Sequence, residues 1–211
     1  SEDTGTKQLA ARALAYLATN TDNRKTIPKA GAIPLLVGLL SSEDTVTKRY
    51  AAKALGILAM NTENHKTIAD EDAIRLLIGL LSSDDTVTKQ RAATAFSNLA
   101  CNTENQKSIA EAGAIKPLVD LLSSKDNDTK QSATAVLAHL AYNNTKNQKT
   151  IADADAIKPL IELLSCKDRK TKRFAALVLA RLACNYTENQ ITIADAGAIE
   201  PLIGLLSSED T

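Results

Sequence analysis

The stretch NQKSIAEAGAIKPLVDLLSS, residues 105–124, holds the signals that decide the fold. Residues 104–111 are predicted to form a two-turn helix that ends before Gly113, because glycine suits the left-handed conformation that follows a helix. A second helix is predicted over 115–122, with Pro117 near its first turn, where the missing N–H costs nothing. No segment of the chain sustains a polar–apolar alternation with a period of two, so we expect essentially no strand.

The same pattern returns along the whole chain at intervals of 41 or 42 residues. The tetrapeptide SEDT stands at 1–4 and recurs at 42–45 and 208–211, and looser copies mark the other boundaries. The repeats span 1–41, 42–82, 83–123, 124–165 and 166–207, with 208–211 as the partial start of a further one. The two longer repeats carry their extra residue in the same place, which marks a loop. Self-similarity at this period predicts a solenoid.

Each repeat also contains a long Ala-rich segment, predicted to be a helix over 86–100 in the third repeat. The order of short, medium and long helix resembles the armadillo repeat, and residues 105–124 together with AFSNLA at 95–100 carry the resemblance. The resemblance implies an all-α, right-handed α-solenoid of about five three-helix repeats without a β-sheet, forming one domain over 1–211. The two-helix HEAT repeat is the alternative fold, but it lacks the separate N-x-x-x-x-I-x-x-x-G segment.

Some columns of the long helices stay apolar in every repeat. Two of them hold Leu14, Leu55, Phe96, Leu137 and Leu179, and Leu17, Leu58, Leu99, Leu140 and Leu182. Two further columns are nearly all Ala, which lets helix axes approach closely. We expect these columns to form the core, because every repeat must stack on its neighbours. Thr134 is the polar exception, and its hydroxyl can bond to its own helix backbone.

Four other columns vary among the repeats and share one face of the long helix at 100° per residue. The resemblance implies that this face lines a continuous concave groove. Its candidate binding residues are Arg12, Tyr16, Arg49, Lys53, Ile57, Arg91, Thr94, Asn98, His139, Arg173 and Arg181. Six of the twenty positions in these columns are basic and none is acidic, whereas the whole chain carries 25 basic and 25 acidic residues. We predict an extended, acidic or phosphorylated peptide as the partner. A solvated face without a partner is the alternative.

The resemblance also permits a comparison with import receptors of the importin-alpha type. In those proteins an Asn ladder on the long helices holds the main chain of a peptide, and Trp residues four positions earlier form pockets for lysine. Only Asn98 matches the Asn column here, while Tyr16, His139 and Arg181 keep hydrogen-bonding capacity in that column. The Trp column holds no Trp. Cargo recognition for nuclear import is therefore excluded, and Asn98 remains a candidate for a main-chain contact.

Composition and motifs argue against several other functions. Zero net charge and 3% aromatic residues disfavour nucleic-acid binding, and no apolar run is long enough to span a membrane. His65 and His139 lie in different repeats, and no catalytic spacing, phosphate loop or metal motif occurs. We expect a non-enzymatic protein without cofactor or metal. An odd count of three Cys predicts no disulfide framework and an intracellular location, cytoplasmic or nuclear.

The junction between short and medium helix departs from the family pattern in two repeats, where Asp72 and Asp155 replace Gly. Because Asp tolerates the left-handed conformation less well than Gly, we expect weaker helix ends there. The first and last helices, 9–18 and 199–206, resemble internal ones. This predicts either a fragment of a longer array or a chain that associates end to end. The alternative function is a purely structural array, designed or excised, without a ligand of its own.

Overall fold

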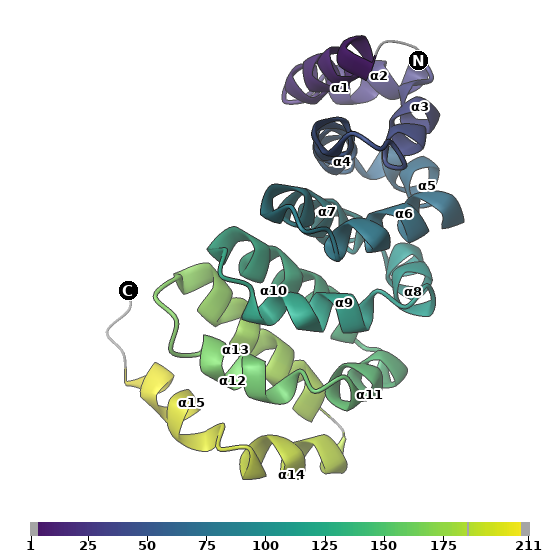
Figure 1. The fold of residues 1–211 in the computed structure, drawn as a ribbon. Helices are drawn as coiled ribbons and strands as arrows, with labels where there is room; N and C mark the ends of the chain where they lie inside the picture. The colour runs from purple at the N-terminus through teal and green to yellow at the C-terminus, as the bar shows by residue number, and fades with distance from the viewer. Residues whose placement is uncertain (1–3, 185, 208–211) are drawn as a thin grey trace. The chain divides into compact units, whose positions relative to one another are not determined.

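A computed structural model describes residues 4–184 and 186–207. These residues form fifteen α-helices and two 3-10 turns, and none of the described residues is in a strand (Figure 1). The chain divides into two compact parts, called here the N-terminal unit, Ser1–Ala114, and the C-terminal unit, Ile115–Thr211. The predicted partial repeat 208–211 lies outside the described residues. The single domain expected over 1–211 stays a prediction.

The N-terminal unit is a series of long helices with shorter helices along one side (Figure 1). Helix α4 packs against α1 and against α7, so the three long helices stack in order. Their bounds and those of the shorter helices are α1 Thr4–Leu17, α2 Asn23–Lys29, α3 Ala32–Leu39, α4 Thr45–Leu58, η1 Thr62–Asn64, α5 His65–Ile68, α6 Glu71–Leu81, α7 Thr86–Leu99 and α8 Thr103–Glu111.

The C-terminal unit repeats this arrangement, with long helices α10 and α13 packed on each other. Its elements are α9 Ile115–Asp120, η2 Leu121–Ser123, α10 Asn127–Ala141, α11 Thr145–Asp153, α12 Ile157–Leu163, α13 Arg169–Ala183, α14 Thr187–Asp195 and α15 Ile199–Leu206. The predicted helices over 86–100, 104–111 and 115–122 correspond to α7, α8, and α9 with η2. None of the described helices is long and apolar enough to cross a membrane.

An Asp begins the later long helices. In α7 the carboxylate of Asp85 accepts hydrogen bonds from the backbone N–H and the hydroxyl of Thr88, at 2.8 and 2.5 Å. These bonds satisfy a backbone donor that has no partner within the helix. Equivalent bonds from Thr47 lower the pKa of Asp44 below its ordinary value. Asp126 caps α10 with the same two bonds, and Asp168 caps α13 by accepting from the backbone N–H of Thr171 at 2.7 Å. In each of these four helices the cap is the Asp and not the serine or cysteine two residues before it.

The short helices close the ends of the long ones. Asn105 donates from Nδ2 to the carbonyl of Leu99, and Gln106 donates from Nε2 to the carbonyl of Ala100, at 3.1 and 2.8 Å. Both side chains are buried, and they donate to carbonyls in the last turn of the long helix, which accept no hydrogen bond within the helix itself. The same pair of bonds comes from Asn64 and His65, Asn147 and Gln148, and Asn189 and Gln190. The sequence comparison used this Asn as a family signature but missed its role.

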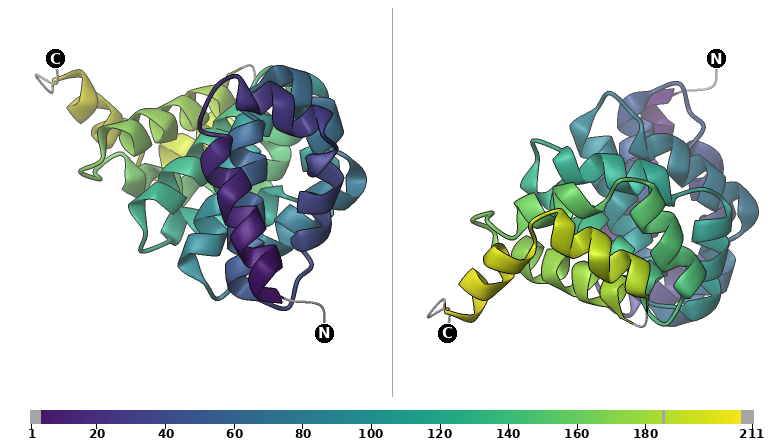
Figure 2. Two further views of the ribbon diagram at one scale, coloured as in Figure 1. Left: turned by 90° about the horizontal axis from the view of Figure 1, so that it is seen from above. Right: turned by 90° about the horizontal axis from the view of Figure 1, so that it is seen from below.

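The two leucine-rich columns form the core as predicted from α4 onward, but not in α1, where Leu14 is only half-buried. Leu58, Leu99 and their equivalents in α10 and α13 are completely buried. Leu17, in the same column, is 52% exposed, so the prediction that it lies in the core is wrong. The reason is that α1 packs on α4, and none of the other described helices of the N-terminal unit covers its other side (Figure 2). Thr134 is buried and donates to the carbonyl of Lys130 at 2.6 Å, as expected.

The two Asp-for-Gly junctions differ from each other. Asp155 adopts the left-handed conformation with φ 65°, close to that of the glycines at Gly31, Gly113 and Gly197. Asp72 does not, because in this repeat α6 begins earlier and Asp70 caps it by accepting from the N–H of Ala73 at 2.7 Å. The short helix α5 is correspondingly reduced to four residues. The chain thus avoids the unfavourable conformation at one junction and adopts it at the other.

Candidate functional site

The eleven predicted groove residues all lie on long helices, and they fall into two sets. The N-terminal unit holds Arg12 and Tyr16 on α1, Arg49, Lys53 and Ile57 on α4, and Arg91, Thr94 and Asn98 on α7. The C-terminal unit holds His139 on α10, and Arg173 and Arg181 on α13. The side chains of Arg12, Tyr16 and Arg173 are exposed, and the other eight are half-buried. We call the face that carries these residues the long-helix face, and we describe it for each unit separately.

A small hollow opens between α4 and α7 on the long-helix face. It has a volume of about 100 Å³ and is lined by polar and apolar side chains. The lining residues are Ala52, Lys53, Gly56, Ile57, Met60, Arg91, Thr94 and Asn98. Five of these were predicted as groove residues, so the structure brings them together. Met60 was missed, because its column lies three positions beyond the compared face and holds Cys or Tyr in other repeats.

Gly56 lets α4 and α7 approach each other beneath this hollow. A Cβ at position 56 would lie 3.3 Å from Cα of Ala95, which is closer than a side chain normally tolerates. The close approach brings Asn98 within reach of the backbone of α4. Its Nδ2 donates to the carbonyl of Gly56 at 2.7 Å. One of the two N–H donors of this amide is therefore used within the protein, and Oδ1 is the atom that can accept from a peptide N–H.

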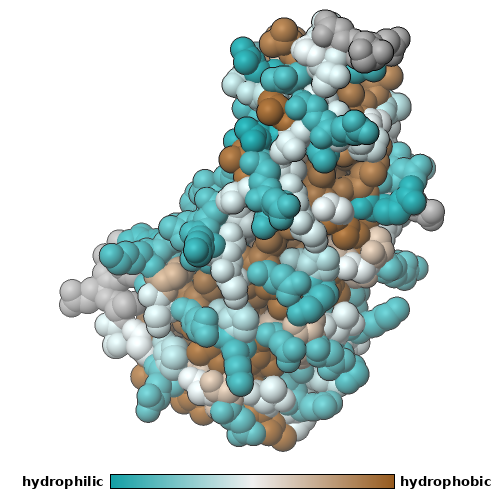
Figure 3. All heavy atoms as spheres, viewed as in Figure 1, coloured by the Kyte–Doolittle hydropathy of each residue, from teal (hydrophilic) through white to brown (hydrophobic). Residues whose placement is uncertain are grey.

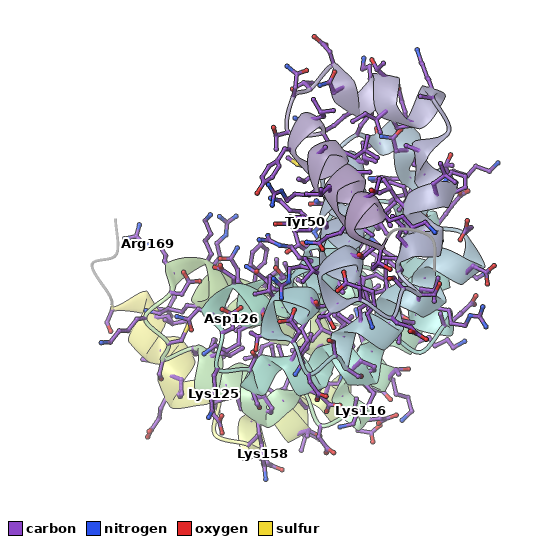
Figure 4. The ribbon with its side chains drawn as sticks, turned by 45° about the horizontal axis from the view of Figure 1, so that its top comes forward. Tyr50, Lys116, Lys125, Asp126, Lys158 and Arg169 are labelled. Atoms are coloured by element: carbon purple, nitrogen blue, oxygen red, sulfur yellow. The ribbon has the colours of Figure 1, made fainter. Side chains whose placement is uncertain are left out.

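Lys53 is held beside two tyrosines. Its Nζ lies 4.3 Å from the ring centroid of Tyr16, which is a cation–π distance. The rings of Tyr16 and Tyr50 are tilted by 58° with their centroids 6.5 Å apart. Tyr50 extends from α4 and is labelled in Figure 4. The two rings restrain an ammonium group that stays half-exposed on the long-helix face.

Arg49 is engaged differently from the other cations. Its Nε and Nη2 donate to the two carboxylate oxygens of Asp85 at 3.3 and 3.0 Å, and only 30% of its side chain is exposed. Burial raises the pKa of Asp85, but the hydrogen bonds from Thr88 and Arg49 outweigh it and lower the pKa overall. Arg49 therefore ties α4 to the capped start of α7, and much of its charge is compensated. Comparison of columns placed it on the face and missed this partner, which lies 36 residues away.

In the C-terminal unit, Arg181 occupies the column of Asn98 and has the same backbone target. Its Nη1 donates to the carbonyl of Ala138, which is equivalent to Gly56. The guanidinium also lies 4.8 Å from the ring centroid of Tyr142. Burial and the positive charge of Arg181 lower the pKa of His139, so the imidazole is biased toward its neutral form. Asn98 and Arg181 thus link successive long helices in addition to lying on the candidate face.

The potential metal ligands and the cysteine thiols are two further kinds of reactive side chain. The described residues contain no cluster of three or more His, Cys, Asp or Glu that could hold a metal ion. Cys101, Cys166 and Cys184 are free thiols, and partial burial raises the pKa of Cys101, which makes its reactive thiolate less available.

Comparison with known proteins identifies the family. The family described as the plant U-box protein ARM repeat region matches residues 1–184. An engineered protein of known crystal structure has 36% sequence identity to this chain and a TM-score of 0.92. The match covers 100% of this chain and 86% of that one. A second engineered protein is 38% identical, with a TM-score of 0.91 and coverage of 100% and 88%.

A designed armadillo repeat protein in complex with the peptide (KR)4 is 27% identical, with a TM-score of 0.89 and coverage of 100% and 89%. A comparison with curated proteins gave no match. The structural matches span the whole chain, and they confirm the predicted all-α solenoid of three-helix repeats. The chain belongs to the armadillo-repeat family, and specifically to the family of plant U-box ARM repeat regions.

Proposed function

We propose that this chain is a non-enzymatic scaffold that binds an extended, acidic or phosphorylated peptide along the long-helix face. The observation that supports this proposal is the hollow between α4 and α7. Two cations, Lys53 and Arg91, line it together with the amide of Asn98, and no carboxylate is among its lining residues. A site with this charge attracts anionic side chains and repels cationic ones.

The related designed protein binds a basic peptide, (KR)4. This chain has cations on the corresponding helices, and they favour a peptide of the opposite charge. Arg49 contributes less than its sequence position suggests, because Asp85 compensates it. The electrostatic preference of the N-terminal unit therefore rests on Arg12, Lys53 and Arg91. We expect binding to weaken as salt is raised, because exposed charges are screened.

The test compares fluorescent peptides of equal length by anisotropy: one rich in Asp and Glu, its serine-phosphorylated version, (KR)4 and a neutral Gly-Ser peptide. We expect the two anionic peptides to bind, the neutral one to bind weakly and (KR)4 not to bind. The double variant Lys53→Glu, Arg91→Glu should lose binding. Lys66→Glu with Lys107→Glu is the matched control, because it makes the same charge change at exposed positions on α5 and α8. Equal affinity for the acidic and neutral peptides, or an equal loss in the control, would refute the proposal.

A second candidate function is structural: an array that associates end to end without a peptide ligand. Large apolar side chains are exposed on the first and last described helices, with Leu17 52% exposed on α1 and Ile203 58% exposed on α15. Within the N-terminal unit one side of α1 is uncovered, and within the C-terminal unit α14 and α15 have an uncovered side (Figure 2). Exposed apolar patches of this kind favour association. A head-to-tail contact between copies would bury both faces.

Sedimentation velocity over a range of protein concentrations tests this second candidate. We expect the sedimentation coefficient to rise with concentration in the wild type, and to stay constant in Leu17→Glu and in Ile203→Glu. A strict monomer at high concentration would eliminate the structural candidate and leave the peptide-binding proposal unaffected.

A further inference from the structure

Two cations converge on one small hollow without an acidic partner among its lining residues. Lys53 comes from α4 and Arg91 from α7, and both line the hollow of about 100 Å³. Arg49 differs from this pair, because Asp85 accepts two hydrogen bonds from it and compensates its charge. The pair in the hollow therefore carries a local charge near +2, which matches the charge of a phosphoryl group better than that of one carboxylate.

Arg91 has an unused hydrogen-bond donor. Its Nε is buried and has no hydrogen-bond partner among the described residues. A buried donor without an acceptor destabilises the structure, so an acceptor supplied by a ligand is favoured. A guanidinium holds its N–H groups in a planar fork that matches two oxygens of a phosphoryl group.

The size and the rim of the hollow limit what can enter. Pockets for whole small-molecule ligands are usually about 300 to 1,000 Å³, so about 100 Å³ suits a single head group. Ile57 and Met60 supply an apolar part of the lining, which can contact the aliphatic portion of the side chain that carries the anion. Asn98 lies in the same lining, with Oδ1 as an acceptor for a peptide N–H.

We propose that the hollow between α4 and α7 is a subsite for the phosphoryl group of a phosphothreonine or phosphoserine in an extended peptide. Arg91 binds two phosphoryl oxygens, Lys53 supplies the second positive charge, and Asn98 accepts from the peptide backbone. This assignment rests on the proposed peptide-binding function and names the side chain that the hollow selects. A glutamate in the same place carries half the charge and lacks the third oxygen, so it binds more weakly.

The test uses three short peptides that differ only in a central phosphothreonine, threonine or glutamate, flanked by the same acidic residues. Isothermal titration gives their affinities for the wild type, Arg91→Gln, Lys53→Gln and the matched control Lys66→Gln, which removes an exposed cation on α5, outside the hollow and the long-helix face. We expect the phosphothreonine peptide to bind at least about tenfold more tightly than the others, as one charge-assisted contact implies. Arg91→Gln and Lys53→Gln should each abolish that preference, and Lys66→Gln should preserve it.

A measurement on the wild type makes the test independent of how the variants fold. In ¹⁵N spectra, inorganic phosphate should shift the Arg91 Nε–H signal and the Asn98 side-chain amide before other signals, whereas chloride at equal ionic strength should not. Equal affinity for the three peptides would overturn the phosphoryl assignment while leaving the peptide-binding proposal intact. Shifts spread evenly over the surface, or an equal loss of preference in Lys66→Gln, would overturn the subsite. If none of the peptides binds, both proposals are wrong.

Discussion

Asn98 and Arg181 show how one position can vary and keep its structural role. They occupy the same column of the repeat, and both donate to the carbonyl of the equivalent residue in the preceding long helix, Gly56 or Ala138. A short amide and a long guanidinium achieve the same link because their target is backbone, which does not depend on the residue type. A variable column is therefore a poor indicator of a free side chain.

A left-handed Asp is a second feature at the level of single residues, and it leads to a prediction. Asp155 has φ 65°, where Gly is unstrained, so Asp155→Gly should stabilise the protein by about 1 kcal/mol. Asp72→Gly is the matched control: Asp72 lies in the first turn of α6 and pairs with Arg75 at 2.7 Å. The control should give no gain, because glycine lowers helix stability there. Urea unfolding measures both variants, and a loss of stability in Asp155→Gly would contradict the assignment of strain.

His139 should make stability depend on pH. Burial and Arg181 lower its pKa in the folded protein, whereas the unfolded chain keeps a value of about 6.5. The unfolded state then binds the proton more readily, so this contribution to stability is present above about pH 6.5 and is lost as the pH falls below it. Urea midpoints at about pH 7.5 and about pH 5.5 should differ more in the wild type than in His139→Gln. Identical differences in the two proteins would rule out this source of pH dependence.

At the level of elements, the helices were predictable because their boundaries depend on local chemistry. The long helix expected over 86–100 is Thr86–Leu99, and its start is set by Asp85 three residues from the N–H that it accepts. The second repeat could not be predicted in detail. There, two helix starts compete, and Asp70 favours the earlier one by capping α6. The column alignment assumes one register for every repeat and so missed this change.

The short helices should be essential to the long ones. Asn105→Ala removes the hydrogen bond from Nδ2 to the carbonyl of Leu99 and leaves that oxygen with only the bond from the N–H of Asn102, at 3.2 Å. The expected loss is about 0.5 to 1.5 kcal/mol in the free energy of unfolding, measured by urea denaturation. Lys107→Ala, at an exposed position of the same helix, should change stability by less than about 0.5 kcal/mol. Similar losses in the two variants would mean that the bond from Asn105 contributes nothing specific.

At the level of the whole molecule, comparison of repeats predicted which residues share a face but not which of them pair with each other. Five groove residues do meet in one hollow, because equal spacing on stacked helices brings equal columns together. The ion pair between Arg49 and Asp85 could not be read from the columns, since it joins a face position to a cap in the next repeat. The exposure of Leu17 depends on what covers α1, which no internal repeat reveals.

In a stack of repeats, the loss of stability caused by a core substitution should be local. Phe96 is fully buried in α7, and Phe96→Ala should cost about 3 to 5 kcal/mol. In a solenoid each repeat contacts its neighbours, so the weakening should be largest near the substitution. Hydrogen exchange should show the greatest loss of amide protection in α4 and α7, which pack together, and a smaller loss in α13. A uniform loss along the chain would instead indicate a single cooperative unit.

The paired bonds from each short helix to the preceding long helix define where this protein can be recombined. If two repeat proteins are joined at a point between Leu99 and Asn105, or between their equivalents, the carbonyl and its donor come from different parents. The hydrogen bond between them can then be lost. A splice in the serine-containing tract before an Asp cap leaves every such pair within one cassette. The interchangeable module is therefore the segment from one tract to the next, such as 83–123. Such modules can be reordered if the new neighbours preserve contacts like the one between Arg49 and Asp85.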